Sequence, residues 1–333
     1  MKHLLIDFDS TIPNLALMKI SAWAKAKGDQ VFLNNMEDEP DFIWLSAIFT
    51  WNRKNAEIAL GSLKFQFPKA VIRFGGTCFD WGMIKDRIQL PIEIENTLPD
   101  YSLYNDDRAV GFCQRGCNRK CQFCDVWRKE GRIEDNAYHR LTEWVPDDFK
   151  KVLLLDNDIA LAEDWKHDQV LTDARDMGLK LSITQGYDIR CITEDRAKLL
   201  AEHKPYNKDF KAYNLYFSWD YIQNEKWVRK GIEILKDAGF TGRQLTCYVL
   251  IGFNTTHEQD MHRIDVLWKE YGVYPYIMAY QNDKKDPMIS AVVRWVNKRQ
   301  LFKSMPFSEY KRNPEYKARK KHLNMTRQLE GFW

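Results

Sequence analysis

The chain has 333 residues, of which 44% are hydrophobic and 14% aromatic, and its formal net charge is +3. This length and apolar content suffice for a sizeable core and predict two domains rather than one. The amino-terminal segment reaches Asp7 too early for the apolar core of a signal peptide, and no apolar run approaches the roughly 18 residues of a membrane span. We therefore expect a cytoplasmic protein without a membrane partner.

The amino-terminal third alternates between short apolar runs and stretches with helical spacing. Pro13, followed by apolar residues at Leu15, Met18 and Ala22, is typical of a helix that begins near residue 14. Such alternation predicts a parallel sheet covered by helices on both faces. The expected strands are residues 2–7, 31–33, 42–46 and 70–74, and the expected helices are 14–27 and 53–63.

After the last of these strands, Gly75-Gly76-Thr77 forms a turn at a carboxyl end. Open α/β sheets bind ligands at such ends, although a plain tight turn explains the same residues. Residues 80–107 follow, with Pro91, Pro99 and little periodicity, and we expect a linker that packs in part.

A second strand–helix series begins near residue 110. Its six units make most of a barrel but fall short of the eight that close one. The expected strands are residues 110–113, 152–155, 180–183, 213–218, 245–251 and 273–279, and the expected helices are 164–177, 194–202, 224–238 and 256–271.

Four of the seven cysteines lie between residues 113 and 124, in a loop that follows the first strand of this second series. Clustering in a large chain indicates metal or redox chemistry, because a disulfide framework spreads its cysteines over a small one. Cys117, Cys121 and Cys124 form the pattern C-x-x-x-C-x-x-C, with Phe123 directly before the last cysteine. Thiolates at such spacing are typical ligands of an iron–sulfur cluster.

This cysteine pattern, between a first strand and five further strand–helix units, resembles the radical S-adenosylmethionine (SAM) superfamily. The resemblance implies an α/β fold, with a partial (βα)6 barrel at residues 105–285. The domain order resembles the branch with an amino-terminal cobalamin-binding-like domain, which implies a small doubly wound, Rossmann-like domain at residues 1–104. Residues 286–333 remain as a basic, aromatic-rich extension.

In that superfamily three cysteines hold a [4Fe–4S] cluster and leave one iron for the amino and carboxylate groups of SAM. An electron from the cluster cleaves SAM, and the resulting 5′-deoxyadenosyl radical abstracts hydrogen from a substrate. The resemblance thus implies a low-potential electron donor of the flavodoxin or ferredoxin type. The substrate is unidentified; RNA and peptide, and methylation as the outcome, are the options considered.

The resemblance also implies cofactor-binding residues at the carboxyl ends of the barrel strands. Phe123 resembles the aromatic residue near the adenine, and Asp156 or Asn157 takes the place of the usual motif for the SAM amino group. Arg190 matches the SAM carboxylate, because guanidinium binds carboxylate in a bidentate manner. The full set is Phe123, Asp156, Asn157, Gln185, Arg190, Ser218, Asp220, Gly252 and Gln281, with Cys117, Cys121 and Cys124 on the metal.

The amino-terminal domain departs from the cobalamin-binding pattern. The usual Asp-x-His-x-x-Gly is absent, and Asp7-Phe8-Asp9-Ser10 has no histidine near it. Two alternatives therefore remain open: the domain binds cobalamin without a histidine ligand, or it is degenerate and only shapes the substrate pocket.

Two alternatives concern other parts of the chain. If Cys113 is a fourth ligand, the site is closed and the protein is a non-catalytic iron–sulfur or zinc protein; otherwise Cys113 is a small buried residue. Between Arg294 and Arg327 there are eleven Lys and Arg residues and two acidic ones. This segment is either a contact for nucleic acid or a terminal helix whose aromatic residues anchor it to the barrel. Those residues are Trp295, Phe302, Phe307, Tyr310 and Tyr316.

Overall fold

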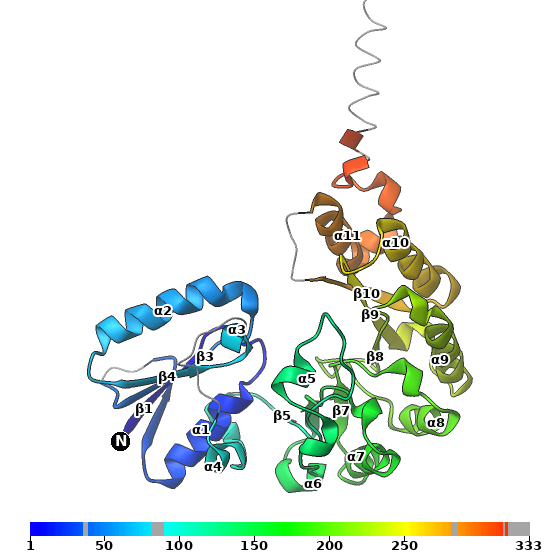
Figure 1. The fold of residues 1–333 in the computed structure, drawn as a ribbon. Coiled ribbons are helices and arrows are strands. Elements are labelled where there is room, and N and C mark those ends of the chain that lie inside the picture. The colour runs from blue at the N-terminus through cyan, green and yellow to red at the C-terminus, as the bar shows by residue number, and fades with distance from the viewer. Residues whose placement is uncertain (36–38, 81–89, 281–285, 316, 319–333) are drawn as a thin grey trace, which may run out of the picture. The chain divides into compact units, whose positions relative to one another are not determined.

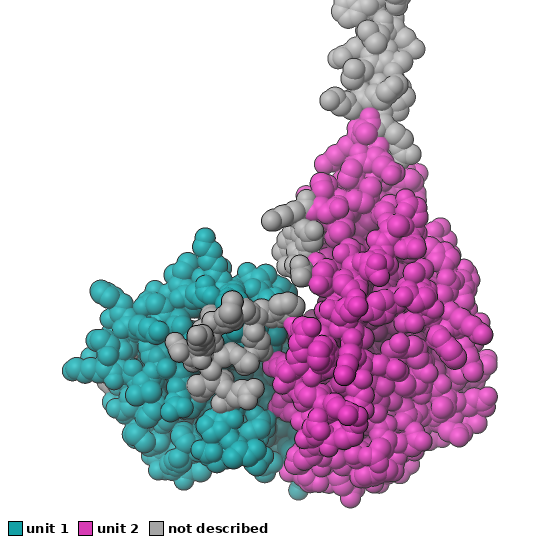
Figure 2. Space-filling view, in the orientation of Figure 1, with its two compact units in different colours: residues 1–111, 144–149 teal, residues 112–143, 150–333 magenta. Residues whose placement is uncertain are grey.

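The computed structural model describes residues 1–35, 39–80, 90–280, 286–315 and 317–318. The chain divides into two compact units: residues 1–111 with 144–149, and residues 112–143 with 150–333 (Figure 2). Both are built from helices and parallel strands, so the predicted α/β class is confirmed. Within the described residues no helix combines the length and apolar character needed to cross a membrane.

The first unit contains a four-stranded parallel sheet in the order β2-β1-β3-β4. Because β1 lies between β2 and β3, the order reverses there, as in doubly wound folds. The strands are β1 (Lys2–Asp7), β2 (Gln30–Leu33), β3 (Phe42–Ser46) and β4 (Val71–Gly75), and the helices are α1 (Leu15–Ala26), α2 (Arg53–Gln66), α3 (Thr77–Asp80) and α4 (Ile92–Glu95).

Alternate residues of β3 pack on opposite helices, which explains why both faces of this sheet are apolar. Trp44 belongs to a buried cluster with Leu17 of α1, whereas Leu45 belongs to a cluster with Leu60 of α2. Figure 1 shows α1 and α2 on opposite faces of the sheet. Side chains at successive strand positions point to opposite faces, so one apolar run serves both cores.

Part of the predicted linker belongs to this first unit. Ile94 of α4 is buried in the α1 cluster, and Lys19 of α1 pairs with Glu95 at 2.8 Å. Asp100 accepts hydrogen bonds from Ser21 and Lys25, both at 2.6 Å. Residues 90–103 are thus fixed to the outer side of α1.

The second unit follows the expected strand–helix series. β6 pairs in parallel with β7, and β9 lies between β8 and β10 in a second parallel sheet. A parallel bridge between Tyr187 and Phe217 connects the end of β7 to β8. The strands from β6 to β10 are therefore neighbours in chain order.

Most elements lie within two residues of their predicted bounds. The strands are β5 (Arg108–Gly111), β6 (Lys151–Leu154), β7 (Lys180–Ile183), β8 (Leu215–Ser218), β9 (Leu245–Ile251) and β10 (Tyr274–Ala279). The helices are α5 (Val126–Lys129), α6 (Leu141–Trp144), α7 (Asp164–Asp176), α8 (Glu194–His203), α9 (Glu225–Asp237), α10 (His257–Asp265), α11 (Pro287–Asn297) and α12 (Arg299–Ser304). The predicted helix 256–271 changes at its end into a π-helical turn, Val266–Glu270.

The carboxyl-terminal helices close the edge of β10. The side-chain amide of Asn297 accepts a hydrogen bond from the backbone N–H of Ile277 and donates one to its C=O, as a neighbouring strand would do. Trp295, Phe302, Phe307 and Tyr310 are all buried and pack on one another. These aromatic residues therefore anchor the segment, whereas Tyr316 lies outside the described residues.

Gly76 provides a direct test of the close packing between the residues that follow β3 and β4 in the first unit. Its φ is +100°, and a Cβ atom there would lie 2.2 Å from the carbonyl oxygen of Ala47. We expect Gly76→Ala to lower the free energy of unfolding by at least about 2 kcal/mol more than Gly28→Ala, because Gly28 also has a positive φ but open space around it. Urea unfolding followed by circular dichroism measures both; equal losses would contradict the steric argument.

Candidate metal centre at the strand ends

The cysteine loop begins on a buried carboxylate. Asp156, which follows β6 and is 2% exposed, accepts hydrogen bonds from the backbone N–H groups of Cys113 at 2.7 Å and Gln114 at 3.0 Å. The side-chain oxygen of Asn157 accepts the N–H of Gly116 at 2.9 Å. The end of β6 therefore fixes the first residues of the loop.

The far side of the loop is held by amide side chains and by one glycine. Asn118 accepts the N–H of Ile133 at 3.0 Å, and Gln114 donates to the carbonyl oxygens of Ile133 and Asn136. Gly116 has a φ of +92°, and a Cβ atom would lie 2.6 Å from the carbonyl of Arg132. Only glycine fits at this position, one residue before Cys117.

Cys117, Cys121 and Cys124 share one environment on this loop. All three are free thiols of intermediate burial. Burial raises the pKa of each thiol. For Cys117, burial together with the charges of Asp158, Cys124 and Cys121 raises the pKa to about 11. The three sulfur atoms are thus close enough to influence one another.

Cys113 lies in a different environment. It is 1% exposed, and its carbonyl accepts the N–H of His139 at 2.8 Å. Burial and the charge of Cys113 raise the pKa of Tyr138. These observations favour a buried structural residue over a fourth ligand.

The donor set fits an iron–sulfur cluster in chemical type. Three unpaired thiols on one loop are the ligands such a cluster uses, and Trp127, just after Cys124, has a buried ring N–H without a partner among the described residues. Within those residues no three His, Cys, Asp or Glu side chains converge closely enough to hold a metal ion. The loop therefore brings its thiols near one another without gathering them at one point.

Cys121 lines a small cleft of about 20 Å³ at the carboxyl ends of the strands. Three other predicted site residues line the same cleft: Arg190 after β7, Ser218 at the end of β8, and Asp220. The remaining lining residues are Asp188, Tyr221, Asn224 and Val228. The structure thus brings together predicted residues from three separate segments of the chain.

Two arginines converge on one carboxylate beside this cleft. Arg190 binds Asp188 in a bidentate manner at 2.7 and 2.8 Å, and Arg119 of the cysteine loop donates to the same carboxylate at 3.0 Å. Burial favours the protonated form of Asp188, but the hydrogen bonds and charge of Arg190, with that of Arg119, hold its pKa below the usual range. The ion pair links the cysteine loop to the end of β7.

Two further carboxylates at these strand ends, Asp158 and Asp220, are half-buried. Burial raises the pKa of Asp220 to about 6, although a hydrogen bond from Ser218 opposes the shift. Burial, with the charge of Asp188, raises the pKa of Asp158 to about 7. Shifted carboxylates in a cleft are typical of functional sites.

Arg263 of α10 fixes the strand ends that carry Asp220 and Gly252. Its fully buried guanidinium donates to the carbonyl oxygens of Trp219 at 2.6 Å and Leu250 at 2.7 Å. Asp260 compensates its charge at 2.6 Å. Sequence reasoning missed Arg263, because an arginine within a helix gives no sign that it is buried. Asp188 and Asn224 were not among the predicted site residues either, although Asp188 lies two residues before the predicted Arg190.

Phe123 contacts the region of the predicted glycine. Its ring lies 5.6 Å from that of Phe253, the neighbour of Gly252, and 5.5 Å from Tyr221. Gly252 itself is exposed, with a φ of +75°. Gln185 is exposed at the end of β7, and Gln281 lies outside the described residues.

In the first unit, the loops after β1 and β3 are tied to each other. Asp9 accepts the N–H groups of Ile48 at 2.7 Å and Phe49 at 3.1 Å, and Asn14 donates to Ser10 and Ser46, both at 2.9 Å. His3 lies within β1, 1% exposed, between Asp29 and Trp44. The side chains at the switch point of this sheet are therefore occupied by internal contacts.

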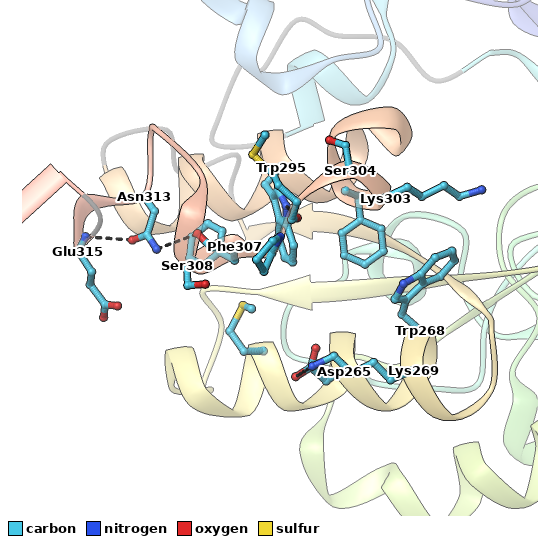
Figure 3. Close-up of a pocket in the computed structure, with 14 residues that line it drawn as sticks. Asp265, Trp268, Lys269, Trp295, Lys303, Ser304, Phe307, Ser308, Asn313 and Glu315 are labelled. Atoms are coloured by element: carbon cyan, nitrogen blue, oxygen red, sulfur yellow. Dashed lines mark hydrogen bonds and ion pairs between the residues drawn. The ribbon is translucent and has the colours of Figure 1, made fainter. Parts of the chain in front are cut away.

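A larger hollow of about 500 Å³ lies beside the carboxyl-terminal helices (Figure 3). Two pairs of polar groups in its lining bind each other: Asp265 with Lys269 at 2.8 Å, and the Trp295 ring N–H with the carbonyl of Met305 at 3.0 Å. The rings of Trp295 and Phe307 pack on each other at 5.1 Å. None of the cysteines lines it.

Neither a scan against protein-family models nor a search of curated proteins gives a match for this chain. The functional argument therefore depends on the residues and geometry described above.

Asp156 tests whether the end of β6 organises the cysteine loop. In Asp156→Ala two buried amides lose their acceptor, at about 1–3 kcal/mol each, whereas Asp156→Asn keeps one acceptor oxygen and should lose about half as much. Hydrogen exchange at the amides of Cys113 and Gln114 should accelerate in that order. Asp176→Ala, which removes a carboxylate that is 61% exposed, is the control and should leave both amides protected.

Proposed function

We propose that this chain is a radical SAM enzyme that acts on an unidentified substrate. The observation that carries the proposal is the cleft in which Cys121 of the C-x-x-x-C-x-x-C loop meets Arg190, Ser218 and Asp220. A cluster held by three thiolates supplies an open iron for SAM and the electron that cleaves it to a 5′-deoxyadenosyl radical.

The order of the strands supports the barrel that this proposal requires. β6 to β10 are parallel and adjacent in chain order, with a helix after each of the first four. A partial (βα)6 barrel, with the cysteine loop after its first strand β5, accounts for this arrangement. In barrels of this kind the site lies at the carboxyl ends of the strands, where the cleft is found.

In this function Cys117, Cys121 and Cys124 hold the cluster, and Asp156 and Asn157 position the loop that carries them. The carboxylate of Asp156 accepts two loop amides and the side-chain oxygen of Asn157 accepts a third, so the backbone carbonyls of these two residues are proposed for the SAM amino group. Arg190 stands beside Asp188, with its side chain 31% exposed, and offers its remaining donors to the SAM carboxylate. Ser218 and Asp220 face the same cleft and suit the ribose hydroxyls.

The rings of Phe123, directly before Cys124 in the chain, and Phe253 lie 5.6 Å apart and offer an apolar surface that suits an adenine ring. Such a surface also excludes water from the site, as radical chemistry requires. Gly252, next to Phe253, and the exposed Gln185 belong to the same proposed cofactor site. A low-potential flavodoxin or ferredoxin type of donor is the proposed reductant.

For the first unit, the tied loops at its switch point favour the alternative of a degenerate domain that holds no cobalamin. Asp9 and Asn14 are fully used by neighbouring loops, and His3 is buried within a strand. Retention of cobalamin by purified protein, detected by its visible absorbance, would overturn this part of the proposal.

The decisive experiment compares cysteine variants after anaerobic reconstitution with iron and sulfide. We expect Cys117→Ala, Cys121→Ala and Cys124→Ala each to abolish the iron–sulfur absorbance, because each removes a ligand. Cys113→Ala and Cys191→Ala are matched controls and should retain the iron. The reduced native protein should change its electron paramagnetic resonance spectrum when SAM is added and should release 5′-deoxyadenosine.

The opposite pattern identifies the closed alternative. If Cys113→Ala abolishes the cluster while one of the other three cysteines is dispensable, no iron is open and the protein is an iron–sulfur or zinc binding protein without this activity. An electron paramagnetic resonance spectrum that does not change when SAM is added leads to the same conclusion.

A further inference from the structure

One face of the β8-β9-β10 sheet is aromatic and open. Parallel sheets normally have both faces covered, yet on β10 Tyr276 is 39% exposed and Met278 is 48% exposed. On the opposite face of the same strands, Phe217, Cys247 and Ile277 are buried. Tyr274, two residues before Tyr276 on the same side of β10, is buried against Phe302 of α12 and donates to the carbonyl of Val296. The open part of this face on β10 is therefore formed by Tyr276 and Met278.

Three tyrosines follow one another across this face. The strand register places Tyr248 opposite Tyr276 on one side and opposite Ser218 on the other, with Tyr216 two residues before Ser218. The rings of Tyr216 and Tyr248 are stacked at 5.5 Å, and Tyr276 meets Tyr248 edge-on at 5.9 Å. The hydroxyl of Tyr248 donates to the carbonyl of Thr184 at 2.8 Å, which fixes the central ring.

This tyrosine face (Tyr216, Tyr248 and Tyr276) leads into the candidate site. Ser218 lies on the same face of β8 as Tyr216 and also lines the cleft that contains Cys121. A Cβ atom on Gly186, between Gln185 and Tyr187, would lie 3.6 Å from the ring of Tyr248. A ligand on the tyrosine face would therefore reach the cleft.

The segment before β8 adds positive charge at the other end of the face. Lys204, Lys208 and Lys211 are exposed, and none of them forms an ion pair with a described residue. Lys204 lies 5.6 Å from the ring of Tyr213, which is 40% exposed. Burial raises the pKa of Tyr216, and the backbone of Lys208 and the charge of Asp209 also act on it, so this part of the segment lies near Tyr216.

We infer that the tyrosine face binds single-stranded nucleic acid, with a base stacked on Tyr276 and phosphates on Lys208 and Lys211. Exposed rings beside unpaired cations match the two requirements of such ligands, base stacking and phosphate neutralisation. That the bound strand is the substrate rests on the proposed function; the binding itself does not.

The first test is fluorescence anisotropy of the full chain with a fluorescein-labelled, mixed-sequence single-stranded RNA and the DNA of the same sequence. Tyr276→Ser should weaken binding roughly 5- to 150-fold, the loss of one stacked base, whereas Tyr276→Phe keeps the ring and should bind normally. Trp227→Ser, which removes a ring that is 51% exposed on α9, is the matched control and should have no effect.

The second test isolates the phosphate contacts. Lys208→Gln with Lys211→Gln should reduce the slope of log affinity against log salt by about 1.4, since each phosphate contact to a single strand contributes about 0.7. The same change at Lys226 and Lys230 of α9 should leave the slope unaltered. Three results would overturn the inference. The protein could bind an RNA duplex as tightly as the single strand, or heparin could displace the RNA as effectively as unlabelled RNA does. The third is tighter binding of a tyrosine-rich acidic peptide at Tyr276.

Metal-free and reconstituted protein are both measured, so that the two proposals fail separately. Release of 5′-deoxyadenosine without RNA or DNA binding overturns this inference alone. Tyr276-dependent binding by a protein that never cleaves SAM supports the nucleic-acid site and rejects the proposed function.

Discussion

The buried carboxylate of Asp156 is the constraint on which the candidate site depends. The cysteine loop has no regular secondary structure of its own between β5 and α5, so its first amides need acceptors from elsewhere. Asp156 supplies two of them from the end of β6, and Asn157 supplies a third. Because these two residues are consecutive, the loop inherits its position from a single strand end, and its thiols are placed relative to the strands that carry Arg190 and Ser218.

A second level of order comes from charged groups buried in the strand ends. Arg263 donates to the carbonyl of Trp219, just after β8, and to that of Leu250 near the end of β9. Asp188 binds arginines from the cysteine loop and from its own turn. Each of these charges is compensated by a partner, which a buried ion requires. The polar groups that look like a reaction site from the sequence thus have two roles in the structure: some line the cleft, and others hold the lining residues in place.

The α/β class and most element bounds were predictable from the sequence, and the division of roles within the site was not. Apolar runs such as residues 245–251 and the capped helix at α1 carry local signals, and the structure has these elements within two residues of their predicted bounds. The pairing of Asp156 with amides 113 and 114 joins residues more than 40 positions apart, and no local pattern encodes it. The same holds for Arg263, whose burial follows from the packing of α10 against two strand ends.

The tyrosines of β8 to β10 show how one periodicity serves both stability and recognition. Alternation along these strands places Phe217, Cys247 and Ile277 under the helices and leaves the intervening positions to the other face. A parallel sheet that needed only stability would fill those positions with aliphatic residues and cover them. Tyrosine keeps the face apolar enough to pack ring on ring, and it still presents a flat, partly solvated surface. Because Ser218 extends that surface to the cleft, strand register places the tyrosine face beside the cleft, and Asp156 places the cysteine loop that brings Cys121 there.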